Sequence, residues 1–143
     1  MQNNDMAWND FYLARRLEWG QGMEPDVARA ARLYRRAALR GLPEAQEALA
    51  FLYATGQGLV QDESMAAKWF GLAAEQGNCA AQHNLGVMYA EGRGVDRDPA
   101  QAVQWFHKAA RNGSEVARDW LHDTRQSLRE QLADAEQVRS TEG

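Results

Sequence analysis

The side chains best suited to chemistry are three histidines and a single cysteine. Cys79 and His83 lie four residues apart, so on a helix they would face the same way. A protein zinc site needs about four such ligands, and neither His107 nor His122 belongs to a cluster that would complete the set. We therefore predict no metal site, and no nucleophilic role for Cys79.

Acidic pairs and glycine-rich segments form no catalytic constellation either. Glu44 and Glu47 lie near an expected helix start, where negative charge suits the helix dipole. A G-x-x-x-x-G-K-[ST] phosphate loop is absent, and the segments G-Q-G and G-R-G recur in register as turns do. Because no nucleophile, base and orienting group come together, we predict a protein that is not an enzyme and needs no cofactor.

Composition narrows the class of protein. The 143 residues carry 16 basic and 20 acidic side chains, a net charge of −4, which argues against nucleic-acid binding. The longest apolar run, residues 48–54, is far shorter than the roughly 20 residues that span a bilayer. No basic residue precedes Arg15, so the basic start of a secretory signal peptide is missing. A lone cysteine forms no internal disulfide, which fits a reducing compartment. We expect one domain in the cytoplasm, without membrane contact.

The elements that position these residues repeat every 36 residues. Shifting the sequence by that distance aligns it with itself without a gap. The shift matches residues of the middle copy to identical residues of the third: Leu49, Tyr53, Gly56, Gly58, Asp62, Trp69 and Phe70 match Leu85, Tyr89, Gly92, Gly94, Asp98, Trp105 and Phe106. A more divergent copy precedes them, which gives repeats at 9–44, 45–80 and 81–116. A period of this length is typical of a stacked solenoid.

Each repeat is predicted to be a helical hairpin. Apolar residues from Ala66 to Ala74 follow helical spacing, the glycines Gly56 and Gly58 reverse the chain, and Asp62 caps the second helix. Trp69 and Trp105 are expected to fill the space between hairpins. The predicted helices are 6–19, 26–40, 44–55, 62–76, 80–91, 98–111 and 115–137.

The last predicted helix has a separate role. Its first half is expected to cap the stack and its second half to protrude, which places the repeat domain at 1–138 and a disordered tail at 139–143. Leu121, Leu128 and Ala135 recur at sevenfold spacing. Such spacing is typical of helices that pair, so a homodimeric or larger scaffold is an alternative role for the chain.

The run from Ala81 to Gly113 reads A-x-x-x-L-G-x-x-Y-x-x-G-x-G-V-x-x-D-x-x-x-A-x-x-W-F-x-x-A-A-x-x-G. It resembles the Sel-one-like repeat, a relative of the tetratricopeptide repeat, over residues 9–116. The resemblance implies an all-α fold, a right-handed α-solenoid of three hairpins with a long C-terminal capping helix. It also implies a bacterial adaptor that assembles protein complexes. Binding of a cell-wall-derived ligand, or a hydrolase-like activity, stays open as an alternative.

By analogy with tetratricopeptide repeats, the first helix of each hairpin lines a concave face. The positions that this analogy selects are Trp8, Phe11, Arg15, Glu18, Glu44, Glu47, Phe51, His83 and Val87. Aromatic groups among charges are typical of protein-binding hot spots. We predict that this groove binds a partner protein or a basic peptide, with Trp8, Phe11 and Phe51 as anchors. The alternative for each anchor is packing against a neighbouring helix.

Arginines crowd the second helix of the first repeat. Arg29, Arg32, Arg36 and Arg40 share one helix face, opposite the apolar stripe that must point inward. We expect a solvated outer face there, with docking of an acidic partner as the alternative.

Overall fold

The computed structural model describes residues 2–142, which form helices joined by short loops, with no strand among them. The helices are α1 (Gln2–Trp19), α2 (Val27–Leu39), α3 (Pro43–Thr55), α4 (Glu63–Glu75), α5 (Cys79–Glu91), α6 (Pro99–Arg111) and α7 (Glu115–Glu142). The predicted all-α fold is confirmed, and α2 to α6 begin and end within one residue of the expected bounds.

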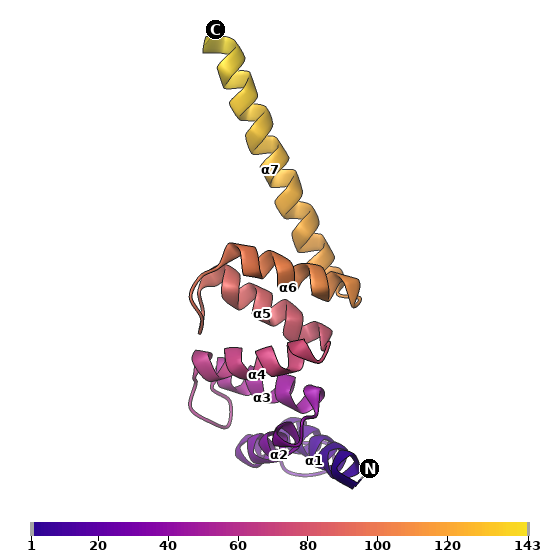
Figure 1. Ribbon diagram of the computed structural model, residues 1–143. Helices are drawn as coiled ribbons and strands as arrows, with labels where there is room; N and C mark the ends of the chain where they lie inside the picture. The colour runs from indigo at the N-terminus through magenta and orange to yellow at the C-terminus, as the bar shows by residue number, and fades with distance from the viewer. Residues whose placement is uncertain (1, 143) are drawn as a thin grey trace.

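The helices pair along the chain as three hairpins, α1 with α2, α3 with α4 and α5 with α6, and the hairpins stack in that order (Figure 1). The core follows the stack, because each joint buries small or aromatic side chains against the next hairpin. Tyr34, Leu49 and Phe106 are fully buried. Trp69 and Trp105 are half-buried and pack against the core cluster of the second and third hairpins, as predicted.

Glycines in the hairpin loops do two different jobs. Gly56 and Gly92 end α3 and α5 in the left-handed conformation, with φ of 71° and 69°. Gly94 lies two residues further on, and a Cβ there would collide with the backbone carbonyl of Glu63 at the start of α4. Gly58 approaches the carbonyl of Val27 in the same way. The loops of the second and third hairpins therefore each contact the backbone of the preceding hairpin.

A buried polar bridge crosses each joint between hairpins. Gln46, on α3, is 5% exposed; its amide nitrogen donates to the carbonyl of Ala38 at 3.2 Å, and its amide oxygen accepts from Gln76 at 2.8 Å. One period later Gln82 donates to Ala74 at 3.1 Å and accepts from Asn112 at 2.9 Å. One side chain thus links its own hairpin to the preceding one.

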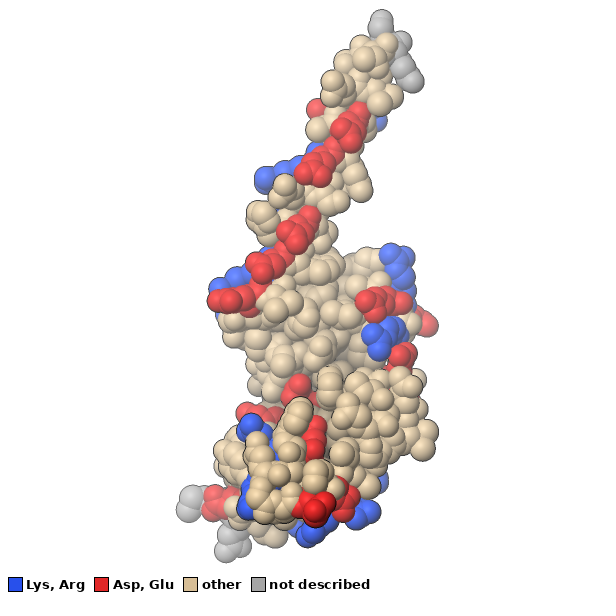
Figure 2. Space-filling model, turned by 180° about the vertical axis from the view of Figure 1, so that it is seen from behind, with Lys and Arg blue, Asp and Glu red and all other residues tan. Residues whose placement is uncertain are grey.

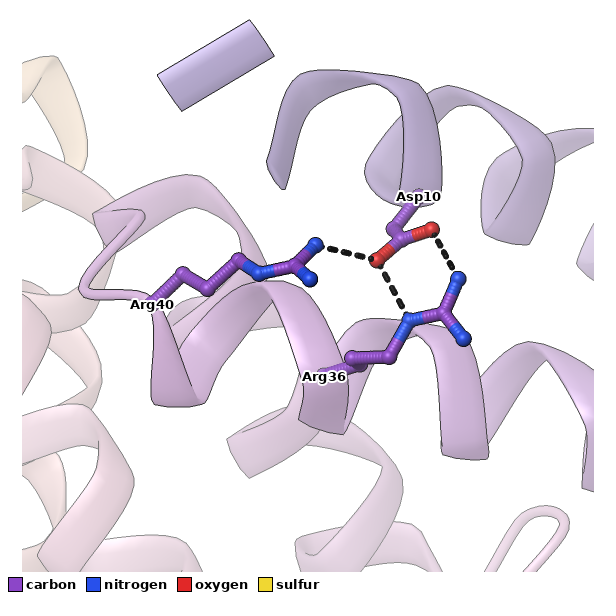
Figure 3. Close-up of polar contacts among 3 residues, drawn as sticks. All are labelled: Asp10, Arg36 and Arg40. Atoms are coloured by element: carbon purple, nitrogen blue, oxygen red, sulfur yellow. Dashed lines mark hydrogen bonds and ion pairs between the residues drawn. The ribbon is translucent and has the colours of Figure 1, made fainter. Parts of the chain in front are cut away.

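In the first hairpin an ion pair takes the place of this bridge. Asp10 occupies the position that Gln46 and Gln82 hold later, and its buried carboxylate accepts from Arg36 at 2.7 and 2.8 Å and from Arg40 at 3.1 Å (Figure 3). Those hydrogen bonds from Arg36 hold the pKa of Asp10 below its usual value, against the opposing effect of burial.

The arginine-rich face of α2 is therefore only partly a free, solvated surface. Arg29 and Arg32 are exposed as predicted. Arg36 is exposed too, whereas Arg40 is half-buried, and both bond to the carboxylate on α1 and tie the two helices of the first hairpin together. The sequence pattern on α2 alone did not reveal this, because the acidic partner lies 26 and 30 residues away.

Helix α7 packs on the stack only at its start. Ala117 is buried and the ring of Trp120 stacks on Phe106 with centroids 4.0 Å apart, whereas residues 122–141 are exposed. Less of α7 therefore caps the stack than the predicted first half, and the rest extends away from the repeats (Figure 1).

The end of α7 differs from the prediction. A disordered tail was expected at 139–143; in the structure α7 continues through residue 142, and residue 143 lies outside the described part of the chain. A helix satisfies its backbone hydrogen bonds internally and needs no burial for that. The hydroxyls of Ser140 and Thr141 add bonds to the carbonyls of Gln137 and Val138.

The bridge predicts the effect of a substitution at Gln82. Gln82→Leu keeps similar bulk but removes a buried amide and leaves the amide of Asn112 and the carbonyl of Ala74 without this partner, so the free energy of unfolding should fall by about 1–3 kcal/mol. Gln104→Leu, at an exposed position of α6, is the matched control and should change it little. Urea denaturation measures both; equal values for the two variants would contradict the bridge.

The loop contact predicts opposite effects at two glycines. Gly94→Ala adds a methyl against the Glu63 carbonyl at a position with φ of 72°, so it should destabilise the fold by about 1–3 kcal/mol. Gly71→Ala lies inside α4 with nothing within 4 Å and should stabilise it by roughly 0.5–1 kcal/mol. Thermal unfolding of both variants tests this, and a stabilising Gly94→Ala would refute the close approach.

The ion pair predicts acid sensitivity. Because the pKa of Asp10 is lower in the folded chain than in the unfolded one, its stabilisation is complete above the unfolded value of about 3.9 and is lost as the pH falls through the folded-state pKa. Asp10→Asn should flatten the fall in stability below about pH 4, and Arg36→Gln should do so too. Urea denaturation between neutral and acidic pH measures this; an unchanged acid profile in Asp10→Asn would count against the pair.

Candidate functional site

The first helices of the hairpins bring the predicted binding residues side by side. Phe11, Glu47 and His83 occupy equivalent positions on α1, α3 and α5, and so do Arg15, Phe51 and Val87. This follows from the 36-residue period, since each turn of the solenoid presents the same position one hairpin further along. Six of the nine predicted residues line two adjacent pockets that share Phe51, and the other three line neither pocket.

The first pocket lies between the first and second hairpins, and we call it the aromatic pocket. It has a volume of about 280 Å³. Its lining residues are Phe11, Arg15, Glu18, Trp19, Tyr34, Glu47, Ala48 and Phe51. Five of the nine residues predicted from the sequence line it. Trp19, at the end of α1, was missed, because the analogy with other repeats selects no residue at that position.

The second pocket lies between the second and third hairpins, and we call it the apolar pocket. It has a volume of about 250 Å³. Its lining residues are Phe51, Ala54, Thr55, Phe70, Asn84, Val87, Met88 and Arg93. Phe51 lines both pockets and is 46% exposed, so the two pockets form one groove that passes over this ring.

The three predicted anchors have different surroundings. Phe11 is only 9% exposed, with its ring 5.8 Å from that of Tyr34, so it forms a wall of the aromatic pocket. Trp8 is half-buried beside Phe11, with centroids 5.5 Å apart, and lines neither pocket. Phe11 thus packs against the neighbouring helix α2, whereas the aromatic neighbours of Trp8, which are Phe11 and Tyr12, lie on its own helix. The exposed aromatic rings of the groove are Phe51 and Trp19, of which Trp19 is 69% exposed.

Two carboxylates give the aromatic pocket its electrostatic character. The hydroxyl of Tyr34 donates to Glu18 at 2.7 Å, and burial, with that hydrogen bond, raises the pKa of Tyr34 far above its usual value. Burial also raises the pKa of Glu47, and the negative charge of Glu18 adds to the effect. The guanidinium of Arg15 lies over the ring of Phe11, 5.8 Å from its centroid. A cationic group entering this pocket would meet aromatic faces and acceptor oxygens together.

The remaining predicted residues lie apart from the aromatic pocket. Val87 lines the apolar pocket. Neither Glu44 nor His83 lines either of them, and Glu44 Oε2 and His83 Nδ1 are buried atoms without a hydrogen-bond partner among the described residues. The ring of His83 lies 5.5 Å from that of Phe106, and burial lowers the pKa of its imidazole.

The groove offers binding groups, whereas metal ligands do not gather anywhere in residues 2–142: no three histidine, cysteine or acidic side chains meet there. The thiol of Cys79 donates to the carbonyl of Ala109 at 3.5 Å. Within the same described range, no helix combines the length and the apolar character needed to cross a bilayer.

Stacked hairpins with an open groove along their first helices define an α-solenoid of the repeat-protein class. The chain belongs to the Sel1 repeat family, which matches residues 11–42, 43–78 and 79–114. The predicted resemblance is thereby confirmed, with repeat boundaries two residues earlier for the second and third copies. Proteins built of Sel1 repeats generally mediate protein–protein interactions. No curated protein matched this chain.

Solved structures of related proteins share the fold. A Sel1 repeat protein from Oxalobacter formigenes is 40% identical, with a TM-score of 0.76 over 82% of this chain and 88% of its own. The uropathogenic Escherichia coli protective antigen c5321 is also 40% identical, with a TM-score of 0.79 over 80% of this chain, which spans 25% of that chain. Helicobacter pylori cysteine rich protein B, at 21% identity and a TM-score of 0.65 over 83% of this chain and 96% of its own, shows the fold alone.

Proposed function

We propose that this chain is a non-catalytic bacterial adaptor in the cytoplasm that binds a partner protein through the groove formed by the aromatic and apolar pockets. The observation that carries the proposal is the aromatic pocket, where Glu18 and Glu47 lie beside the exposed rings of Trp19 and Phe51. The single cysteine, which is free, supports a reducing compartment.

The chemistry of the pockets indicates the kind of segment that fits. An arginine or lysine of the partner would enter the aromatic pocket, where its charge would offset the cost of keeping Glu47 ionised in a partly buried place. A neighbouring apolar side chain would enter the apolar pocket against Val87 and Met88. Phe51, shared by both pockets, would pack between the two side chains. The ligand is thus a basic segment with an apolar residue close to the cation.

A peptide-display selection on the full-length chain tests this proposal. The selected peptides should pair arginine or lysine with an apolar residue, and Phe51→Ala and Glu47→Gln should each weaken their binding by roughly tenfold or more, as expected of hot-spot residues. Binding is measured by isothermal titration calorimetry, and circular dichroism checks the helical content of each variant.

The matched controls are Leu39→Ala and Glu75→Gln. These replace an exposed apolar and an exposed acidic side chain on α2 and α4, outside both pockets, and they should leave the affinity unchanged. Selection of peptides without basic residues, or equal affinities for Phe51→Ala and Leu39→Ala, would refute binding in the groove.

A further inference from the structure

The free part of α7 carries an apolar stripe that no described part of the chain covers. Leu128, Leu132 and Val138 are 56%, 58% and 54% exposed, and Ala135 is exposed beside them. At 1.5 Å per residue, the exposed segment 122–141 is roughly 30 Å long. Isolated helices of this length are marginally stable in water and gain most of their stability from packing of an apolar face.

The stripe has the spacing of a helix that pairs with another helix. Leu121, Leu128 and Ala135 recur every seven residues, and Thr124, Gln131 and Val138 lie three residues after each of them. Alternating steps of three and four residues keep these side chains on one narrow seam. Leu132 lies at one edge of the seam and widens its apolar part.

Charges of opposite sign border the two edges of the stripe. In the seven-residue register of the seam, Asp134 flanks it on one side, and Arg125 and Arg139 flank it on the other. Asp123, Glu130 and Arg129 lie further round the helix, away from the seam. Figure 2 shows acidic side chains in a line along α7, with basic side chains beside it.

This arrangement distinguishes the two ways in which identical helices can pair. In a parallel pair, Asp134 of each copy lies beside Arg139 of the other. In an antiparallel pair, the side with Asp134 faces its own copy, and so does the side with Arg125 and Arg139. Opposite charges at these flanking positions set partner choice and orientation in coiled coils, and like charges in such juxtaposition are unfavourable.

The charged groups are available for contacts between chains. The only ion pair within α7 among the described residues joins His122 and Asp123 at 3.6 Å, and Gln126 donates to Glu130 at 3.4 Å. Arg125, Arg129 and Asp134 form no ion pair within residues 2–142.

We propose that two copies of this chain pair in parallel through α7, with the exposed seam from Thr124 to Val138 at the interface. The two repeat stacks then lie at the same end of the paired helices, so the dimer presents two grooves to one partner assembly. Two linked sites raise the apparent affinity for a partner with two matching segments. Pairing depends on residues outside both pockets and is therefore independent of the proposed groove function.

The mass of the full-length chain in solution tests pairing. Sedimentation at concentrations up to about 100 µM should show a dimer of the 16.1 kDa chain, and replacing Leu128 and Leu132 by Asn should shift it to the monomer. The matched control places the same residue on the opposite face of α7, as Gln126→Asn with Ala133→Asn, and should remain dimeric. A monomeric wild type, a larger assembly, or a dimeric Leu128 and Leu132 double variant would overturn the proposal.

Charge exchange tests the role of the two edges without removing the apolar seam. Replacing Asp134 by Arg places it beside Arg139 of the other copy and should weaken dimerisation severalfold. Adding Arg139→Asp restores the opposite charges and should recover most of the lost affinity. Equal dimerisation of both variants would overturn the assigned role of the edges.

Oxidative cross-linking tests the orientation. In a Cys79→Ser background, Val138→Cys should form a disulfide-linked dimer on mild oxidation, because parallel pairing brings the two copies of position 138 together at the seam. Ala133→Cys, on the opposite face, is the control and should cross-link slowly. A dimer that fails to cross-link through position 138 would show antiparallel pairing and overturn the proposal.

Discussion

A buried side-chain amide at each joint is the constraint on which the rest of the solenoid depends. The helices meet mainly through alanine, and small apolar faces pack in more than one register with little difference in energy. Gln46 and Gln82 remove that freedom, since each must accept from its own hairpin and donate to the preceding one. An unsatisfied amide at such a place costs more than the bond itself is worth. The position of the groove therefore follows from the register that these bridges fix.

The molecule has two candidate binding surfaces, the groove and the seam of α7, and they differ in the side chains that they present. The groove combines carboxylates with aromatic rings, and it is assembled from α1, α3 and α5, so it exists only when the hairpins are stacked. The seam of α7 lies on a single helix beyond the ring of Trp120, which closes the core against Phe106. Neither Trp120 nor Phe106 lines the groove, so the contact between them separates the two surfaces along the chain.

Much of this architecture could be predicted from the sequence because it is local and periodic. Helical spacing, the glycines that end α3 and α5, and the capping carboxylates of Asp62 and Asp98 repeat visibly. The bridges could not, since each joins side chains 30 residues apart and the equivalent positions hold Asp10, Gln46 and Gln82, whose types differ. Likewise a position rule borrowed from other repeats located Phe51 in the groove but not the burial of Phe11, which depends on how the first hairpin packs.

The change from glutamine to aspartate at position 10 gives the array a chemical polarity. Gln46 and Gln82 each donate to a carbonyl of the preceding hairpin. Arg118, at the equivalent position of α7, does the same by donating to the carbonyl of Ala110 at 3.2 Å. A carboxylate has no proton to donate at neutral pH, so α1 is built as a terminus against which no further hairpin finds its hydrogen-bond donor. Lengthening such an array therefore calls for duplication of an internal unit such as residues 43–78. This unit has a donor for the preceding hairpin, Gln46, and an acceptor for the next one, the carbonyl of Ala74. Its duplication would add one more pocket to the groove.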